Sequence, residues 1–550
     1  MQCARGNNRM NSVSQENTKG SILIVVVIAL GMILRLYGLT AKPLWYDETG
    51  FIAHALKDLG FMRHSVANYK IPYTVLLKIW INIFGIGAFA ARILSASLGI
   101  ASILLVYRLG KSLFNTGVAL IASFLLSISC FHIYHSQQVK HYSFLVFLVL
   151  LSFIYFIDFL KRKKSSMLML NLLLNILIVC AHPFGLSVIA VQFLYIICIH
   201  RAMDRKQFKK WLYFQLPLVL FLGLWAWILI AEKDYFKAIL WWARPPNIQS
   251  LTDTFHTFYY GGPTYGLDSL NPTSFPPMIV LAMMRIFEIF FILGLFRIFS
   301  QQVKGHQAFV VIWLVVPITL IFLFSYLFFP VYLIKDFLFF LPAFYLIVAR
   351  GIYYKRKSFS LAILVIVFLL NIIPLKTMYG ATIKVDWQKA VRFIKGNDLK
   401  DDDIIIMATT KEVVPFMYYL SDADKAALKD LLIFGKFEDG RWQESFRYKD
   451  HLIITIGIEQ SQWKAGYQDS EPGTNMMHSL DYITSDFDRK VMQQEDIINS
   501  NRQIWLLVSR WEDDVNRSAQ ALSDKLKMYS KLTLSKKVGG IKIYRFRPRL

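Results

Sequence analysis

The chain has 550 residues, of which 55% are hydrophobic, 15% are aromatic and only 18% are charged. Soluble domains carry about a quarter charged residues, and apolar runs recur here at the length that crosses a bilayer, which excludes an ordinary soluble protein. The formal charge of +24 would suggest nucleic-acid binding in a soluble protein, but many of the basic residues lie in short loops between apolar runs. Such loops set membrane topology and contact anionic lipids, so we expect membrane lipids and no nucleic acid as partners.

The N-terminal residues 1–20 form a basic tail with Arg5, Arg9 and Lys19, and an apolar run follows over 21–34. This order resembles a secretory signal, but no small-residue cleavage site follows, which predicts an uncleaved first membrane span. The four cysteines lie in the tail and the apolar runs without the spacing of a metal site or a disulfide framework.

A short acidic stretch, Lys42-Pro43-Leu44-Trp45-Tyr46-Asp47-Glu48, comes directly after this first span. Its aromatic residues favour the level of the lipid headgroups. Asp47 and Glu48 are therefore expected just past the end of a span, where a carboxylate could take a proton from a water-borne substrate while a lipid-borne one approaches from the side. The alternative is a solvated acidic loop without chemistry.

Eleven further apolar segments follow, and the positive-inside rule tests how many of them cross the bilayer. The strongly basic loops at 161–164, 201–210, 297–306 and 350–357 should all be cytoplasmic, together with the N-terminus. This parity requires one early segment not to cross. Segment 71–84 is short, contains Lys78 and Asn82, and fits a helix that lies in the membrane interface. About eleven transmembrane helices remain; the eleven further segments are 71–84, 88–107, 113–130, 143–160, 167–181, 184–199, 211–231, 277–298, 308–329, 333–349 and 359–375.

This topology predicts a multi-pass protein of the plasma (inner) membrane with a loop-rich outer face, where function is expected. The transmembrane domain covers 21–376 and contains the first outer loop, 40–87. The region 377–550 has shorter apolar runs, at 403–409, 451–457, 503–509 and 540–546, with helix-like stretches at 387–394 and 519–528. Strands that alternate with helices predict an extracytoplasmic α/β domain. It has no glycine-rich phosphate loop, so we expect no nucleotide cofactor.

Outside the cytoplasm there are no nucleotide sugars or ATP, so activated groups must arrive on lipid carriers, typically polyprenyl phosphates. The donor's phosphate then leaves and needs cations, and the acceptor hydroxyl needs a carboxylate base. Asp47 and Glu48 are the candidate catalytic acids, and Lys70, Lys140 and Lys335 are the candidate phosphate-binding cations on the outer side. The alternatives are a snorkelling Lys140 and a local ion pair between Lys335 and Asp336.

Histidines gather near the same outer loops, in the segment 132–141 and in the tight turn at His182. The spacing of His132, His135 and His141 is not a standard ligand pattern, so we expect no metal. His182 is expected to stabilise its turn and, alternatively, to belong to the site. The remaining site candidates are Tyr46, Gln138, His141 and Tyr142.

The order of these motifs resembles the C-type membrane glycosyltransferases (GT-C) related to protein O-mannosyltransferases and to bacterial aminoarabinose and galacturonic acid transferases. The resemblance covers the organisation of residues 20–375 and is most specific over 35–145. It is carried by four motifs, which are Arg35-Leu36-Tyr37 with Leu44-Trp45-Tyr46-Asp47-Glu48, Lys70-Ile71-Pro72-Tyr73, the segments 83–95 and 107–114, and His135-Ser136-Gln137-Gln138-Val139-Lys140-His141-Tyr142.

The resemblance implies inverting transfer of one sugar from a polyprenyl-phosphate donor, usually without a required metal. It implies that Asp47 is the base, that Glu48 orients the acceptor or the site, and that Lys70, Lys140 and Lys335 lie near the donor phosphate. The chain departs from the family pattern where Gln138 replaces Glu, Lys140 replaces Arg and Asp336 replaces Tyr. A lysine cannot form the bidentate fork of an arginine. Asp386-Trp387 resembles a recurrent feature of bacterial relatives and is expected to begin a structural helix.

Two functions of other classes stay open. A lipid or ion transporter would carry polar residues at mid-span and paired discontinuous helices, but the segments 113–130 and 359–370 carry no charged residue and no repeat is evident. A membrane-anchored binding protein would use its external domain and make the span-end charges incidental. The acceptor of the favoured transferase, whether a glycan, a lipid or a protein, does not follow from the sequence.

Overall fold

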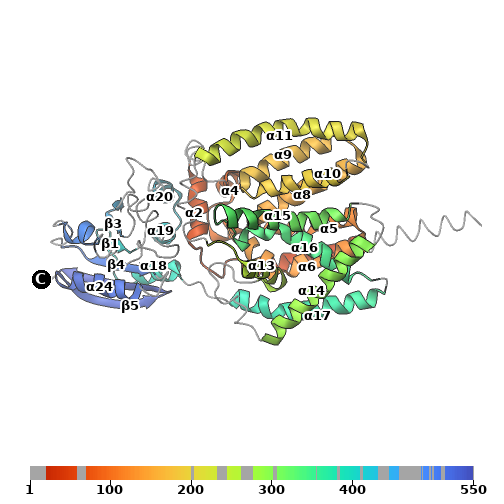
Figure 1. The fold of residues 1–550 in the computed structure, drawn as a ribbon. Coiled ribbons are helices and arrows are strands. Elements are labelled where there is room, and N and C mark those ends of the chain that lie inside the picture. The colour runs from red at the N-terminus through yellow and green to blue at the C-terminus, as the bar shows by residue number, and fades with distance from the viewer. Residues whose placement is uncertain are drawn as a thin grey trace, which may run out of the picture. The chain divides into compact units, whose positions relative to one another are not determined.

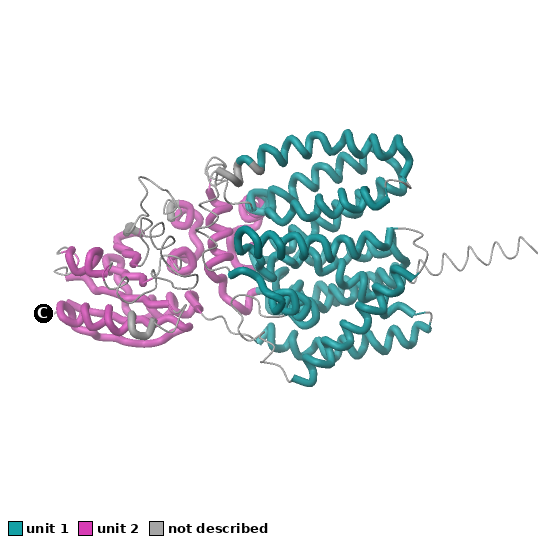
Figure 2. Tube along the Cα trace, in the orientation of Figure 1, with its two compact units in different colours: residues 1–39, 65–76, 92–381 teal, residues 40–64, 77–91, 382–550 magenta. Residues whose placement is uncertain are grey.

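The computed structural model describes residues 20–57, 70–199, 203–231, 244–261, 277–300, 306–354, 356–380, 385–408, 413–431, 445–456, 485, 487–494, 497, 501–509 and 515–548. The chain forms two compact units (Figure 2). Unit 1 consists of residues 1–39, 65–76 and 92–381, and unit 2 consists of residues 40–64, 77–91 and 382–550. Residues 40–64 and 77–87 of the first outer loop are thus grouped with the C-terminal region, and residues 65–76 with unit 1. The predicted domain boundary near residue 377 assigns the whole loop to the transmembrane part.

Unit 1 is a bundle of apolar helices, which Figure 1 shows running roughly alongside one another. It begins with the helix Gly20–Leu36. The helices that follow are α4 (Ile71–Phe84) and α5 (Ala88–Leu113), which each also have residues in unit 2, then α6 (Thr116–Ile128), α7 (Cys130–Ser136), α8 (Tyr142–Arg162), α9 (Ser165–Ala181), α10 (Gly185–Ile199), α11 (Arg205–Ala231), α13 (Ile248–Tyr260), α14 (Pro277–Ser300), α15 (Ala308–Leu327), the 3-10 helix η4 (Ile334–Phe340), α16 (Leu341–Ile352) and α17 (Lys357–Gly380).

Within the described ranges, five helices are long and apolar enough to cross a membrane, and the bent pair α6–α7 makes a sixth if it counts as one span. Four shorter apolar helices accompany them, among them Gly20–Leu36 and α4. The expected class, a helical membrane protein with a small C-terminal α/β domain, is confirmed. The number of eleven spans and the interfacial position of α4 stay predictions.

Two predicted spans are interrupted. The chain bends by 61° at Ser129, between α6 and α7, so segment 113–130 does not continue as one straight helix and residues 130–136 are helical where a loop is expected. Segment 333–349 begins with η4 before it continues as α16. Both interruptions lie next to candidate site residues, since α7 leads to Lys140 and η4 contains Lys335.

A closed network of polar side chains joins α8, α9 and α10 inside the bundle. Ser152 donates to Asn175 (2.7 Å), Asn175 donates to Gln192 (3.1 Å), and Gln192 donates back to Ser152 (3.0 Å). The side-chain amide of Asn171 also donates to the Ser152 hydroxyl, at 2.9 Å. Because these groups satisfy one another, they act as interhelical contacts that fix the register of the three helices.

Unit 2 contains a six-stranded mixed sheet with the order β2-β3-β1-β4-β6-β5. The central strands β3, β1 and β4 are parallel, and the outer pairs β2–β3, β4–β6 and β5–β6 are antiparallel. The elements of this unit are α2 (Tyr46–Leu56), α18 (Trp387–Lys395), β1 (Ile404–Met407), α19 (Val413–Leu420), α20 (Lys425–Leu431), β2 (Ser445–Tyr448), β3 (His451–Thr455), the π-helix η7 (Asp488–Met492), β4 (Ile504–Ser509), α24 (Val515–Lys527), β5 (Ser530–Val538) and β6 (Ile541–Pro548).

Every residue of β1 and β4 is buried, so the centre of the sheet is covered on both faces, which explains why these two strands are almost entirely apolar. One face packs through Ile404, Ile406 and Leu506 against Leu522 and Leu526 of α24. All four strands expected from the sequence are present, and the stretches 387–394 and 519–528 are helical as predicted. Asp386 caps α18 by accepting the amide of Lys389 at 2.9 Å, which agrees with the expected helix start.

Candidate functional site

The loop that joins α7 to α8 carries the most buried cation among the predicted site residues. The Lys140 side chain lies 5.6 Å from the centre of the Tyr142 ring, and Lys140 is only 5% exposed. Two hydrogen bonds hold the Lys140 backbone. Its amide donates to Gln138 O within the loop (2.8 Å), and the hydroxyl of Ser95 in α5 donates to its carbonyl (3.3 Å). Ser95 is in turn bonded to the hydroxyl of Tyr73 at 2.8 Å. The loop therefore has a fixed conformation that depends on α4 and α5.

A fully buried arginine stabilises the bend between α6 and α7. Arg35 donates to the carbonyls of Leu126 and Ser127, each at 3.0 Å, in the last turn of α6, where the bend interrupts the regular helical hydrogen bonds. Its guanidinium also contacts Nδ1 of His132 in α7 at 2.8 Å. One side chain from the first helix thus connects both halves of the broken helix.

The packing around Arg35 leaves no room for a side chain at two neighbouring glycines, Gly31 and Gly99. A Cβ at Gly31 would lie 2.2 Å from Ile103, and a Cβ at Gly99 would lie 2.3 Å from the Ser136 hydroxyl oxygen. Gln137, which follows α7, completes the connection by donating to Tyr37 O (2.8 Å) and Arg35 O (3.1 Å) at the end of the first helix. The first helix and the α7 end therefore fix each other just before the Lys140 loop.

Three side chains far apart in the sequence meet beside this loop. Ligand atoms of His141, His182 and Asp336 all lie within 4.8 Å of one another, and all three residues are buried. The His182 ring is stacked on that of His141, with ring centres 5.6 Å apart, and its Nε2 lies 3.6 Å from a carboxylate oxygen of Asp336. His182 also receives the amide of Phe184 on Nδ1 at 3.1 Å, so it stabilises its turn as expected and belongs to this cluster as well.

This geometry favours a close pair of His182 and Asp336 over a metal site. Because Nδ1 of His182 accepts an amide proton, the proton of a neutral ring lies on Nε2, which faces Asp336. A protonated Nε2 cannot ligate a metal ion, and the nearby lysines would repel one. The expectation of no metal stays a prediction.

Burial and nearby positive charges set the electrostatics of the cluster. The pKa of His141 lies well below its ordinary value, first because of burial and then because Lys70, His182, Lys140 and Lys335 oppose a further positive charge. Asp336 is paired with His182 and also lies near the charges of Lys335 and Lys70. The cluster thus has a neutral His141, an ionised Asp336 and three lysines, an arrangement that suits an anion with more than one negative charge.

The predicted catalytic acids lie in unit 2, in the first turn of α2. Glu48 is completely buried, whereas Asp47 is half-buried and Tyr46, which begins the helix, is half-buried too. The partial positive charge of a helix N-terminus favours anionic side chains in the first turn. Of the two carboxylates, Asp47 is the more exposed.

The other predicted candidates lie in unit 1. Gln138 and Tyr142 flank the Lys140 loop and are buried, and Lys70 precedes α4 while Lys335 lies in η4, each half-buried. The structure brings Lys70, Lys140, Lys335, His141 and His182 around one buried centre. Sequence reasoning treated Asp336 only as a neighbour of Lys335, and it missed the supporting roles of Arg35, Gln137 and Ser95.

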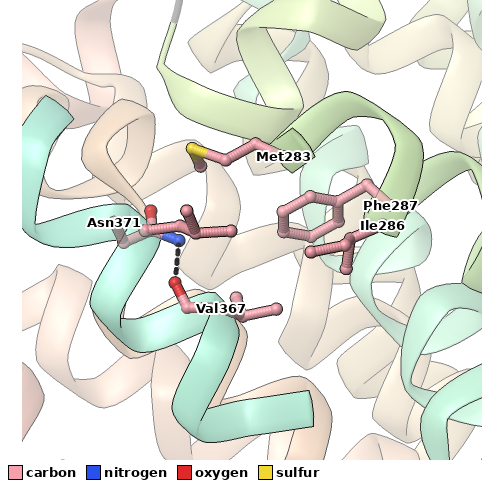
Figure 3. Close-up of a pocket in the computed structure, with 6 residues that line it drawn as sticks. Met283, Ile286, Phe287, Val367 and Asn371 are labelled. Atoms are coloured by element: carbon pink, nitrogen blue, oxygen red, sulfur yellow. Dashed lines mark hydrogen bonds between the residues drawn. The ribbon is translucent and has the colours of Figure 1, made fainter. Parts of the chain in front are cut away.

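A small hollow of about 130 Å³ between α14 and α17 is a poor candidate for chemistry. Figure 3 shows Met283, Ile286 and Phe287 facing Val367 and Asn371, and the Asn371 amide donates to Val367 O at 2.9 Å. Its lining carries no titratable group. The lysine-lined cluster is therefore the candidate site of unit 1.

Comparisons with known proteins agree with the resemblance drawn from the motifs. Residues 72–227 match the family model described as dolichyl-phosphate-mannose-protein mannosyltransferase. The fold is similar to that of ArnT from Cupriavidus metallidurans in the apo state, with a TM-score of 0.56 and 9% identity over 95% of this chain and 97% of that one. The same protein bound to undecaprenyl phosphate aligns over the same shares, with a TM-score of 0.52 and 10% identity. No curated protein matches the chain in sequence.

Proposed function

We propose that this chain, which is PMT-like over residues 72–227 and has the fold of ArnT, is a membrane glycosyltransferase that uses a polyprenyl-phosphate-linked sugar. It transfers a single sugar to the hydroxyl of an acceptor glycan, lipid or protein at the outer face of the membrane, with inversion at the sugar carbon. The observation that carries the proposal is the group of three lysines around buried His141 and Asp336.

The charge of this group fits the leaving group. Three lysines against the carboxylate of Asp336 leave two net positive charges when the histidines are neutral. A polyprenyl-phosphate sugar is a diester with one negative charge, and it becomes a monoester with up to two as the bond from the sugar carbon to the phosphate oxygen breaks. The site therefore stabilises the departing phosphate more than the bound donor, which is the condition for accelerating the reaction.

The residues of α2 supply the other half of the reaction. Asp47 takes the proton of the acceptor hydroxyl as its oxygen bonds to the sugar carbon, and buried Glu48 fixes the helix turn that presents Asp47. The support is the position of both acids in the first turn of α2 and the greater exposure of Asp47. ArnT bound to undecaprenyl phosphate shows that this fold accepts a polyprenyl phosphate in that protein, and we transfer this ligand class to the present chain.

The test uses the full-length protein in lipid nanodiscs with a panel of polyprenyl-phosphate sugars and membrane extracts as acceptors. Released polyprenyl phosphate is measured. Asp47→Asn should keep its thermal unfolding profile and lose release by about 100-fold or more, the usual contribution of a general base. Asp401→Asn, an exposed carboxylate of the C-terminal region, serves as the control. Full release by Asp47→Asn would remove Asp47 from the base role, and no release from any donor by the unaltered protein would overturn the proposed function.

A further inference from the structure

The helix that carries the two acids is surrounded by parts of the C-terminal region. Within unit 2, α2 packs against α19 and α20 (Figure 2, magenta). An isolated helix of 11 residues is marginal in water, so the position of α2 depends on these tertiary contacts. They bury Thr49, Ile52 and Ala53 in addition to Glu48.

A tyrosine of α19 fixes the chain where it enters α2. The amide of Leu44 donates to the hydroxyl of Tyr419 at 2.6 Å, and this hydroxyl lies 3.4 Å from the Leu44 carbonyl oxygen. Leu44 is 1% exposed and lies three residues before Asp47. The N-cap residue, Trp45, makes no side-chain cap. The hydrogen bond to Tyr419 therefore provides a side-chain restraint on the backbone at this end that the helix itself does not supply.

Lysines fix the other end of α2. Lys78 donates to the carbonyl of Lys57 at 2.6 Å and lies 3.4 Å from that of Ala55, so that a cation meets the last carbonyls of the helix. The Lys57 amine donates to the carbonyl of Lys429 in α20. Lys57 is only 6% exposed, and lysines are rarely this buried unless they are paired. Both ends of α2 are thus bonded to the α19–α20 segment, one at Tyr419 and one at Lys429.

We infer that the α19–α20 segment of the C-terminal region is the positioning element of the acid-bearing helix. It holds the backbone before Asp47 and the last turn of α2, and it thereby sets where the carboxylates stand. The value of this positioning for transfer depends on the proposed function. The restraint of α2 by Tyr419 is a separate physical claim and can be measured without turnover.

The test compares Tyr419→Phe with Tyr418→Phe in the full-length protein. The two changes remove the same atom from adjacent residues, but the Tyr418 hydroxyl donates to the carbonyl of Ile86, away from α2, at 2.8 Å. Loss of one buried hydrogen bond is expected to raise hydrogen–deuterium exchange of the 44–56 peptide about 5-fold in Tyr419→Phe, because such a bond contributes about 1 kcal/mol. Tyr418→Phe should leave this peptide unchanged. With donor, Tyr419→Phe should lower kcat several-fold at an unchanged KM for the donor.

Lys57→Gln provides a second probe at the opposite end of α2, in case Tyr419→Phe folds poorly. It should raise exchange in the same peptide and leave the exchange of β1 and β4 unchanged. Unaltered exchange in both variants, an equal rise in Tyr418→Phe, or a rise of the donor KM alone would overturn the inference. If the unaltered protein releases no polyprenyl phosphate, the proposed function fails, and the exchange measurements still decide whether Tyr419 restrains α2.

Discussion

The role of Arg35 can be tested by Arg35→Lys, which keeps the positive charge and removes the planar fork. Arg35 reaches Gly31 O and Ser127 O with one nitrogen, and Leu126 O and His132 with the other. A compact ammonium cannot span both sides of the bend. We expect at least two hydrogen bonds to be lost, at about 1 kcal/mol each, so that opening of the α6–α7 bend becomes easier by about 2 kcal/mol.

The assay uses Cys130, the first residue of α7, which is 2% exposed. In a background where the other three cysteines are replaced by alanine, maleimide reaches Cys130 only when α7 detaches. An easing of about 2 kcal/mol predicts about 30-fold faster labelling in Arg35→Lys. The matched control is Arg297→Lys, because Arg297 likewise donates to three carbonyls, those of residues 350, 351 and 353, at the end of α16. Equal labelling of Arg35→Lys and the unaltered protein, or an equal rise in Arg297→Lys, would refute the argument.

Two further predictions concern the lysine-lined cluster. Lys140→Met removes one of three charges near the proposed phosphate position, so it should raise the donor KM and lower kcat by about 10-fold or more, because the departing phosphate carries more charge than the bound donor. Exposed Lys537→Met should change neither. An unchanged kcat and KM for Lys140→Met would contradict the phosphate role. The pKa of His141 is lowered by burial and by nearby cations. Below a pH of about 6.5 the unfolded chain therefore binds a proton at this histidine, whereas the folded chain does not. The free energy of unfolding then falls by up to about 1.4 kcal/mol per pH unit. His141→Gln should show a shallower fall in thermal stability between pH 6.5 and 5, and identical slopes in the two proteins would speak against a buried neutral His141.

Much of the fold follows from local patterns. The limits predicted for segment 71–84 coincide with those of α4, because a mostly apolar stretch is bounded there by Lys70 and Gly85. The strands at the centre of the sheet were predictable because they are short, apolar and rich in isoleucine. Strand β5 escaped prediction because it lies at the edge of the sheet and carries charged residues such as Lys531 and Lys536, as edge strands often do.

The site was predictable only in part. Lys140, Lys335 and His182 each stand at the end of an apolar run, which is a local signal, and all three lie at the cluster. The pairing of His182 with Asp336 joins residues 154 positions apart and has no local signature. The bend at Ser129 was missed for a similar reason, since no proline or glycine marks it and its stabilising partner, Arg35, lies about 90 residues earlier.

The buried guanidinium in the first helix has a consequence for how the protein assembles. Apart from Gly31 O in its own helix, the partners of Arg35 are synthesised after it, 91, 92 and 97 residues later in the chain. A charged side chain is costly in hydrocarbon until it finds partners. Helix Gly20–Leu36 should therefore stay at the insertion machinery, or near the bilayer surface, until the segment around residue 130 arrives, so that the first span matures together with the fourth apolar segment rather than alone.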